Sequence, residues 1–433
     1  MSAIWNPQAE TMPREELSQL QLERLQSTLN RAYRYVAYYH KVLDEAGLQP
    51  EDLQALTDLR RLPFTTKESL RQSYPYGMFA LPLREVVRLH FSTGATGAAT
   101  VVGYTQNDVR NWTELVARNL TACGLTKEDV VQIFFGFGVF TGGFGFQYGA
   151  EALGAAVIPV ASGDVARQVQ IMEDFRTTAI IGTPSYALHL GRLMEKIGHD
   201  PHSLSLRVGL FGSEPWSEQT RAEIEARLLL TAYDTYGLSE IGGPGVSGEC
   251  ECRCGLHIAE DHFYVEVVDP ATGEPLPEGR EGELVFTTLT KEAFPLVRYR
   301  TGDLASLTTE PCSCGRTLAR MSRIVRRTDD MLILRGVSVY PDTVEECLRH
   351  FTEVGGGFQL VVRREEDLDT LEVLVEIGTL HDLTFKAVES LREKLTDELS
   401  TTLGLELTVR MVEPHSLTSP TGRLPRVRDE RAL

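Results

Sequence analysis

A chain of 433 residues with 42% hydrophobic and 24% charged residues is typical of a globular protein of two or three domains. Its formal net charge of −18 argues against nucleic acid as the main partner, because phosphate backbones bind basic surfaces. No apolar run is long enough to span a membrane, and the acidic N-terminal segment does not resemble a secretory signal, so we expect a cytoplasmic protein without a membrane partner.

The first predicted element is a long helix over Glu15–Ala46, because Leu17, Leu25 and Leu29 recur near helical spacing. This pattern is typical of an amphipathic helix that lies on a core. A turn and a short helix are expected over Gly47–Pro63.

The segment His90–Tyr104 places glycines and hydroxyl side chains between two apolar, β-like runs. Glycines let the backbone curl around an anion, and hydroxyl and amide groups then point inward. The segment is therefore a candidate triphosphate cradle, although it lacks the lysine of the Walker A loop; a tight β-hairpin is the alternative. Its candidate phosphate-binding residues are Ser92, Thr93, Gly94, Thr96 and Gly97.

From Thr105 to Tyr236 the pattern alternates between helix and strand. Helices are expected over Asn107–Cys123, Gly143–Leu153, Ala166–Phe175, Tyr186–Ile197 and Ser217–Leu228, and strands over Val130–Phe135, Ala156–Val160, Ala179–Ile181, Leu206–Phe211 and Leu230–Tyr233. This alternation predicts an α/β fold with a parallel sheet covered on both faces. Ligands bind such sheets at the carboxyl ends of the strands.

Beyond Gly248 the pattern becomes β-rich, and from Asp329 a βαββαβ order predicts a small α+β domain. The β-rich strands are expected over Phe263–Val268, Gly282–Thr288 and Leu304–Thr308; the later strands over Met331–Leu334, Phe358–Arg363, Leu371–Ile377 and Leu405–Val412; and the later helices over Tyr340–His350 and Phe385–Leu403. With Arg326–Asp330 as the linker, we predict an N-terminal domain of residues 1–328, including a β-rich subdomain at about 249–328, and a C-terminal domain of residues 329–433.

An aromatic-rich segment follows the first strand of the predicted sheet. It carries Phe135, Phe137 and Phe140 with Gly142 and Gly143, and its glycine spacing does not fit G-x-G-x-x-G. Such a strand end suits a flat apolar ligand. The alternative is that these aromatic rings pack beneath a helix.

Three further strand ends are polar, and each offers a carboxylate beside aromatic or backbone surface. The candidate nucleotide-binding residues are Ser213, Glu214 and Pro215, then Asp234, Tyr236, Gly237 and Glu240, then Asp303. A purine needs a stacking surface, a ribose needs a carboxylate for its hydroxyls, and a metal-bound triphosphate needs a hard oxygen ligand. One such turn alone is typical of solvated acids, but together they favour a nucleotide site.

Five cysteines fall into two clusters, and spacing of this kind is typical of zinc sites. The candidate ligands are Cys250, Cys252, Cys254, Cys312, Cys314 and His257. Spacing alone favours Cys252 or Cys254 with His257. We expect a structural zinc rather than reduced surface thiols, whereas the turn around Arg423 by itself is typical of a basic tail.

The order of these motifs resembles the phenylacetate–CoA ligases, a branch of the adenylate-forming superfamily. The resemblance runs from near Glu10 to the last residues. It rests on Ala9–Leu17, Leu62–Lys67, Ser92–Gly97, Gly212–Trp216, Tyr236–Glu240, Glu260–Phe263, Phe286–Glu292 and Asp329–Val337.

The resemblance implies a role for each matching residue. Ser92–Gly97 would form the phosphate loop, Ser213–Pro215 the adenine turn, Tyr236 the ring stacked on adenine, Glu240 the magnesium ligand, Asp303 the ribose carboxylate with Arg327 nearby, Asp329 the hinge of the small domain, Phe135–Gly143 the aryl pocket, and Arg423 the counterpart of the catalytic lysine. It also implies Cys250, His257, Cys312 and Cys314 as the zinc ligands, in disagreement with spacing alone.

The reaction implied by the resemblance has two steps. An aromatic carboxylate attacks the α-phosphate of magnesium-bound ATP and releases pyrophosphate, after which the CoA thiol displaces AMP from the acyl adenylate. The implied substrates and cofactors are the aryl acid, ATP, Mg²⁺, CoA and a structural Zn²⁺, and the family suggests a homodimer.

Several residues depart from the family pattern. Ala98 and Arg423 stand where the family has lysines, Gly302 where it has arginine, Arg326 where it has glycine, Ser338 where it has asparagine, Gln147 where it has histidine, and Phe135 and Phe137 where it has tyrosines. Because arginine and lysine differ in shape, we expect slower adenylation. The alternatives are an enzyme with an acceptor other than CoA and a weakened homologue that only binds nucleotide.

Overall fold

The computed structural model describes residues 3–92, 100–138, 140–161, 163–324, 326–329, 331–365, 368–378, 385–413, 416–419, 422–423 and 426–431. These residues form two compact units, a large unit that ends at Thr328 and a small unit that begins at Asp329. Each unit has its own hydrophobic core.

The large unit begins with helices that lie on its core. They are α1 (Pro7–Glu10), α2 (Arg14–Tyr35), α3 (Ala37–Glu45) and α4 (Lys67–Gln72), with short 3₁₀ turns at Pro50–Asp52, Leu56–Arg61 and Leu83–Glu85. The prediction of one helix over Glu15–Ala46 is wrong at Val36, whose extended backbone (φ −111°, ψ 107°) separates α2 from α3. Leu25 and Leu29 are buried, as the helical spacing predicts.

A parallel sheet forms the centre of the large unit. Its strands β3 (Val130–Ile133), β4 (Ala156–Pro159), β5 (Ala179–Gly182), β6 (Val208–Gly212) and β7 (Thr231–Tyr236) alternate with helices α5 (Gln106–Ala122), α6 (Gly142–Leu153), α7 (Val165–Asp174), α8 (Pro184–Lys196) and α9 (Glu218–Leu228), and a 3₁₀ turn covers Pro201–Ser203. The strand order is β7-β6-β5-β3-β4, and all of these neighbours are parallel. The predicted α/β fold is confirmed.

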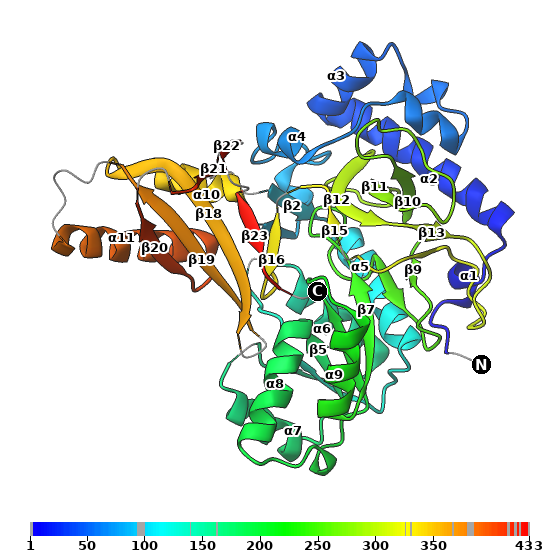
Figure 1. Ribbon diagram of the computed structural model, residues 1–433. Helices are drawn as coiled ribbons and strands as arrows, with labels where there is room; N and C mark the ends of the chain where they lie inside the picture. The colour runs from blue at the N-terminus through cyan, green and yellow to red at the C-terminus, as the bar shows by residue number, and fades with distance from the viewer. Residues whose placement is uncertain are drawn as a thin grey trace. The chain divides into compact units, whose positions relative to one another are not determined.

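Helices cover both faces of this sheet because its strands are apolar on both sides. Ile181 and Leu210 pack into one core with residues of α5 and α6, whereas Ile180 and Phe211 pack into another core with residues of α7, α8 and α9. Figure 1 shows α7, α8 and α9 grouped beside the sheet. Alternate side chains of one strand thus feed two cores, as expected for a strand buried on both faces.

Antiparallel strands extend this sheet and build a second one. Strands β8 (Ser247–Glu249), β9 (Leu256–Ile258), β14 (Arg320–Met321) and β13 (Leu307–Thr308) continue the first sheet beyond β7, giving a nine-stranded sheet, and β10 (Phe263–Val268), β11 (Gly282–Thr288), β12 (Tyr299–Ala305) and β15 (Arg326–Arg327) form a four-stranded sheet. The strand predicted over Leu304–Thr308 is in fact the end of β12 followed by β13, so Asp303 lies inside a strand and not in a turn.

The segment His90–Tyr104 forms an antiparallel hairpin of β1 (Arg88–Ser92) and β2 (Thr100–Tyr104). The loop between these strands, which carries the candidate phosphate-binding residues Thr93, Gly94, Thr96 and Gly97, lies outside the described residues.

The small unit is an α+β domain in which a four-stranded sheet packs against helices. Its elements are β16 (Leu332–Leu334), β17 (Val337–Val339), α10 (Pro341–Leu348), β18 (Val354–Glu365), β19 (Leu368–Ile377), α11 (Phe385–Leu403), β20 (Thr408–Val412), β21 (Thr418–Ser419), β22 (Gly422–Arg423) and β23 (Val427–Asp429). The sheet order is β20-β19-β18-β23. The predicted βαββαβ order is present as β16, α10, β18, β19, α11 and β20. The structure adds strands at both ends: β16 pairs with the additional strand β17, and β23, beyond the segment interpreted as a tail, supplies the fourth strand of the sheet.

None of the helices in the described parts of the chain is long and apolar enough to cross a membrane.

A buried ion pair joins the N-terminal helix to the cysteine-bearing loop. The Glu10 carboxylate at the end of α1 accepts from Arg316 Nε over 2.6 Å, and both side chains are 2% exposed. Arg316 Nη2 also donates to the Ala3 carbonyl over 2.7 Å. Because a buried charge without its partner is strongly destabilising, this pair holds the first residues against the large unit.

We expect Glu10→Ala to lower the free energy of unfolding by about 3 kcal/mol, because it leaves the Arg316 guanidinium buried and without its counter-charge. Urea denaturation followed by circular dichroism measures this loss. Glu16→Ala, at an exposed position of α2, is the matched control, and equal losses in the two variants would contradict the prediction.

Candidate active site and metal centre

The two sheets of the large unit meet at the carboxylate of Asp303. Asp303 lies on β12 of the four-stranded sheet and is 3% exposed. The phenol of Tyr236, on β7 of the nine-stranded sheet, donates to Asp303 Oδ2 over 2.8 Å. Arg327 lies opposite Asp303 in the β12–β15 ladder, and its Nη1 pairs with Oδ1. The carboxylate is thus fixed from two directions where the two sheets meet.

Burial raises the pKa of Tyr236 well above its usual value, and the negative charge of Asp303 adds to this shift. The phenol therefore stays protonated and remains a donor at neutral pH. The Tyr236 ring also stacks on Phe286 with centroids 6.1 Å apart. A carboxylate oriented in this way can accept hydrogen bonds from neighbouring sugar hydroxyls.

The turn after β6 carries the predicted adenine-binding residues Ser213, Glu214 and Pro215. It is anchored by hydrogen bonds to a neighbouring helix. Ser213 has φ of 64°, a left-handed conformation that a non-glycine residue seldom adopts. The Glu214 carboxylate accepts from the backbone N–H of Ser185 at 3.2 Å and from its hydroxyl at 2.9 Å. The Glu214 side chain thus anchors the turn to the start of α8.

Asp234 supports the same turn from inside the protein. Its carboxylate lies 3.1 Å from Arg323 Nε, and the Arg323 guanidinium covers the ring of Trp216 at 4.6 Å. Burial raises the pKa of Asp234 to about 7, against the opposing effect of Arg323. The structure therefore places this predicted nucleotide-binding residue beneath the turn, with its charge directed at an arginine that sequence analysis did not single out.

Glu240 lies in a tight loop after β7. The Leu238 carbonyl accepts from the amides of Ile241, Gly242 and Gly243. A Cβ at Gly237 would lie 1.9 Å from the Gly243 oxygen, so only glycine fits this close approach. Glu240 is 5% exposed, and within the described residues no hydrogen bond or ion pair engages its carboxylate. A buried carboxylate with free oxygens is suited to a hard cation.

The predicted aryl pocket residues separate into two groups. Phe135 stacks on the core residue Phe146 at 5.6 Å, whereas Phe137 meets Phe144 edge-to-face at 5.5 Å. Phe140 is 37% exposed. Gly142 and Gly143 begin α6 close to this loop, where a Cβ at Gly143 would lie 2.7 Å from the Gly136 oxygen. The loop thus combines a packed side with an aromatic side that is not fully buried.

The last strand of the large unit leads directly to the boundary between the units. The Thr328 amide donates to the Gly302 carbonyl over 2.7 Å, and Asp329, the predicted hinge, follows. Gly302 has φ of 78°, a conformation that favours glycine over the family's arginine. The side chains of Ser92 and Arg423 lie outside the described residues, although their backbones form the end of β1 and part of β22.

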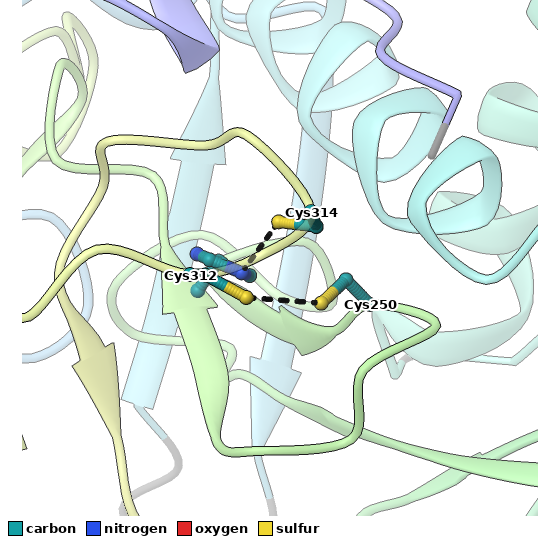
Figure 2. A group of neighbouring side chains, drawn as sticks. Cys250, Cys312 and Cys314 are labelled. Atoms are coloured by element: carbon teal, nitrogen blue, oxygen red, sulfur yellow. Dashed lines mark hydrogen bonds between the residues drawn. The ribbon is translucent and has the colours of Figure 1, made fainter. Parts of the chain in front are cut away.

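Four of the candidate zinc ligands come together, as Figure 2 shows for the three cysteines. The ligand atoms of Cys250, His257, Cys312 and Cys314 all lie within 4.8 Å of one another, and all four residues are buried. The Cys250 and Cys312 sulfurs are 3.8 Å apart, and Cys314 Sγ is 3.4 Å from His257 Nε2. This is the set implied by the resemblance, and the described cluster includes neither Cys252 nor Cys254, which spacing paired with His257.

The distances in this cluster fit a tetrahedral zinc ion. Zinc–sulfur bonds of about 2.3 Å in a tetrahedron place two sulfurs about 3.8 Å apart. The other ring nitrogen of His257, Nδ1, lies 3.3 Å from the Leu318 carbonyl, which orients the imidazole and leaves Nε2 for a metal.

A cleft that sequence analysis missed contains a buried amine. It lies between α5 and the loops around Ile241 and Lys291, and its volume is only about 30 Å³. The Lys291 ammonium lies over the Tyr104 ring, 3.0 Å from its centroid, and Nζ has no hydrogen-bond partner among the described residues. Burial lowers the pKa of Lys291 to about 7, although Asp108 opposes the shift. The sequence feature that could have indicated this site is the polar run Thr290-Lys291-Glu292, just after the predicted strand Gly282–Thr288.

Two profiles of known protein families match the chain, one within each unit. A family profile described as AMP-binding enzyme matches residues 23–289, and one described as AMP-binding enzyme C-terminal domain matches residues 336–431.

Two relatives match over almost their whole length, and both are phenylacetate-coenzyme A ligases. The protein from Thermus thermophilus is 48% identical over 99% of this chain and 100% of its own. The protein from Escherichia coli is 47% identical over 98% of this chain and 97% of its own.

Among solved structures, a 2-hydroxyisobutyryl-CoA ligase in complex with its acyl-AMP and CoA has a TM-score of 0.94 at 31% identity. The match covers 99% of this chain and 93% of that chain. The similarity therefore extends over both units.

Lys291 makes the stability of the large unit depend on pH. Between about pH 7 and the ordinary lysine value of 10.5 the unfolded chain binds a proton that the folded chain does not. The free energy of unfolding therefore rises with pH in this window, by at most about 1.4 kcal/mol per pH unit. Lys291→Met should remove this rise.

Urea denaturation at several pH values between neutral and moderately alkaline measures the difference between wild type and Lys291→Met. Lys41→Met, at an exposed position, is the control and should follow the wild type. Parallel pH profiles for wild type and Lys291→Met would contradict the prediction.

Proposed function

Because the chain belongs to the phenylacetate–CoA ligase family of AMP-binding enzymes, we propose that it joins phenylacetate, or a similar aryl acid, to coenzyme A. ATP is cleaved to AMP and pyrophosphate in the first of two steps. The observation that carries the proposal is the buried Asp303 carboxylate, held by Tyr236 and Arg327 where the two sheets meet. The proposal includes a cytoplasmic homodimer, as the family suggests.

In the first step the acid carboxylate attacks the α-phosphorus of ATP, and pyrophosphate leaves. We assign the ribose hydroxyls to Asp303, with Arg327 fixing the carboxylate, and the adenine to the turn Ser213–Pro215 and the ring of Tyr236. Gly237 would let the following loop fold back tightly beside the nucleotide site, because a Cβ there would collide with the Gly243 oxygen. Asp234 would act through this turn, because its own carboxylate pairs with Arg323.

The phosphates are assigned to the loop Ser92–Gly97 and to a magnesium ion at Glu240. The buried Glu240 carboxylate, unpaired within the described residues, fits such an ion, which would supply charge stabilisation for the phosphoryl oxygens. The chain's own contribution is to fix the loop that carries Glu240, through the three hydrogen bonds from backbone amides to the Leu238 carbonyl. Ala98 contributes no cation where the family has a lysine.

The acid's aromatic ring is assigned to the loop of Phe135, Phe137 and Phe140, with Gly142 and Gly143 beside it. Phe137 and its neighbour Phe144 support this assignment, because their edge-to-face contact leaves an apolar aromatic surface. Phenylalanines offer no hydroxyl to a polar ring substituent. This pocket therefore favours an unsubstituted aryl group.

In the second step the CoA thiol attacks the acyl carbonyl of the adenylate, and AMP leaves. We propose that the small unit moves about Asp329 between the two steps. Arg423, on the short strand β22, would supply its positive charge to the carboxylate and α-phosphate in the first step.

We further propose that Cys250, His257, Cys312 and Cys314 bind a structural zinc ion. The cluster is buried and has four ligands, so it has no open position of the kind that catalytic zinc requires. Bound zinc would cross-link the β8–β9 hairpin to the loop of Cys312 and Cys314.

Purified protein with ATP, Mg²⁺ and a panel of aryl acids tests the proposed reaction. We expect exchange of pyrophosphate into ATP only with an acid present, and a thioester and AMP once CoA is added. Glu240→Gln should lose both activities. Adenylate formation without transfer to CoA would instead favour the adenylyltransferase alternative, and binding of nucleotide without exchange would favour the weakened homologue.

Arg423→Lys tests whether arginine slows adenylation. Lysine restores the compact cation of the family, so we expect pyrophosphate exchange to rise roughly tenfold, equivalent to about 1.4 kcal/mol in the barrier. Arg410→Lys, on the exposed side of β20, should leave the rate unchanged. A loss of exchange in Arg423→Lys would contradict the expectation and identify arginine as the adapted catalytic residue.

A further inference from the structure

The cysteine cluster holds one thiol more than its buried ligand set uses, in contact with that set. Cys254, in the loop between β8 and β9, is exposed, yet its sulfur lies 3.6 Å from the sulfur of Cys312. Arg320 Nη1 donates to Cys254 Sγ over 2.8 Å. A tetrahedral zinc ion takes four ligands, and three cysteines with His257 already supply them, so Cys254 stands beside the site as a fourth thiol, held toward a ligand sulfur.

We propose that Cys254 and Cys312 form a disulfide when the protein meets a peroxide, and that this disulfide releases the bound metal. The inference depends on the zinc site assigned above. The proposed modification site is the pair of Cys254, which is exposed, and Cys312, which is one of the assigned metal ligands.

The chemistry needs only the two sulfurs and a peroxide. The exposed Cys254 thiol attacks the peroxide O–O bond, giving a sulfenic acid and, from hydrogen peroxide, water. The Cys312 sulfur then leaves the metal and attacks the Cys254 sulfur, forming the S–S bond and expelling hydroxide. Two electrons pass from the sulfurs to the peroxide. The metal is left with only three of its four protein ligands, so it is bound more weakly and dissociates.

The other cysteines are placed less well for this reaction. Cys252 is also exposed, but its sulfur faces the Ser313 hydroxyl at 3.1 Å. Cys123 and Cys347 are buried and lie outside the cluster. Cys254 is therefore the exposed thiol already in sulfur–sulfur contact with a ligand, and Cys252 provides a matched control.

Loss of the metal should loosen the β8–β9 hairpin within the nine-stranded sheet. Cys250 directly follows β8, and β8 pairs with β7 through Tyr236 and Ser247. His257 lies on β9, which pairs with both β8 and β14. Oxidation at Cys254 would thus reach the strand that carries Tyr236 by removing a cross-link from its neighbours.

The experiment treats the zinc-loaded full-length protein, its Cys254→Ser variant and its Cys252→Ser variant with hydrogen peroxide. Zinc release is followed with a chromogenic chelator, disulfide-linked peptides by mass spectrometry, and the melting temperature by calorimetry. We expect wild type and Cys252→Ser to release zinc, to yield the Cys254–Cys312 peptide and to melt at a lower temperature. Cys254→Ser should release zinc several-fold more slowly and yield no such peptide.

Equal zinc release from wild type and Cys254→Ser, or a disulfide that excludes Cys254, would overturn the inference while leaving the zinc site in place. The zinc content before oxidation separates this failure from failure of the zinc assignment. A wild-type protein that binds no zinc would overturn both.

Discussion

The large unit depends on the polar junction at Asp303. This buried carboxylate belongs to β12, and it is bonded by Tyr236 from the other sheet and by Arg327 from the neighbouring strand. Two sheets that otherwise meet through apolar side chains are thereby fixed in one relative position. The last backbone bond before the boundary, from Thr328 to Gly302, closes the same strand pair, so the proposed ribose site and the proposed hinge share one support.

Away from Asp303, buried ion pairs and the cysteine cluster hold other parts of the large unit together. Arg316 pairs with Glu10 at 2.6 Å, and Arg118 binds both oxygens of Asp261, at 2.8 and 3.0 Å. The pKa of Asp261 falls well below its usual range because Arg118 and His262 offset its burial. Of the groups assigned to catalysis, Asp303 and Tyr236 lie on strands, whereas the turn Ser213–Pro215 and Glu240 lie in loops that follow strands.

Sequence pattern predicted the parallel sheet because continuous apolar strands and amphipathic helices differ in period. It failed where tertiary pairing decides the outcome. Asp303 looked like a turn residue because its strand is polar. The strand β23, beyond the segment interpreted as a tail, was missed because its partner β18 lies more than sixty residues earlier in the chain. The register of the β8–β9 hairpin decides which cysteine lies near His257. His257 pairs with Gly248, so Cys250, two residues further along, falls on the same face. Cys252 and Cys254 lie further along the loop that joins the two strands. Nothing in the local pattern could show that Lys291 is buried.

The central claim is that Asp303, positioned by Tyr236 and Arg327, binds the ribose hydroxyls. Calorimetric titration of wild type and Asp303→Asn with AMP, and with the analogue that lacks both ribose hydroxyls, tests it most directly. The account predicts that the wild type prefers AMP and that Asp303→Asn, folded as judged by circular dichroism, loses most of this preference. An unchanged preference in Asp303→Asn would contradict the account.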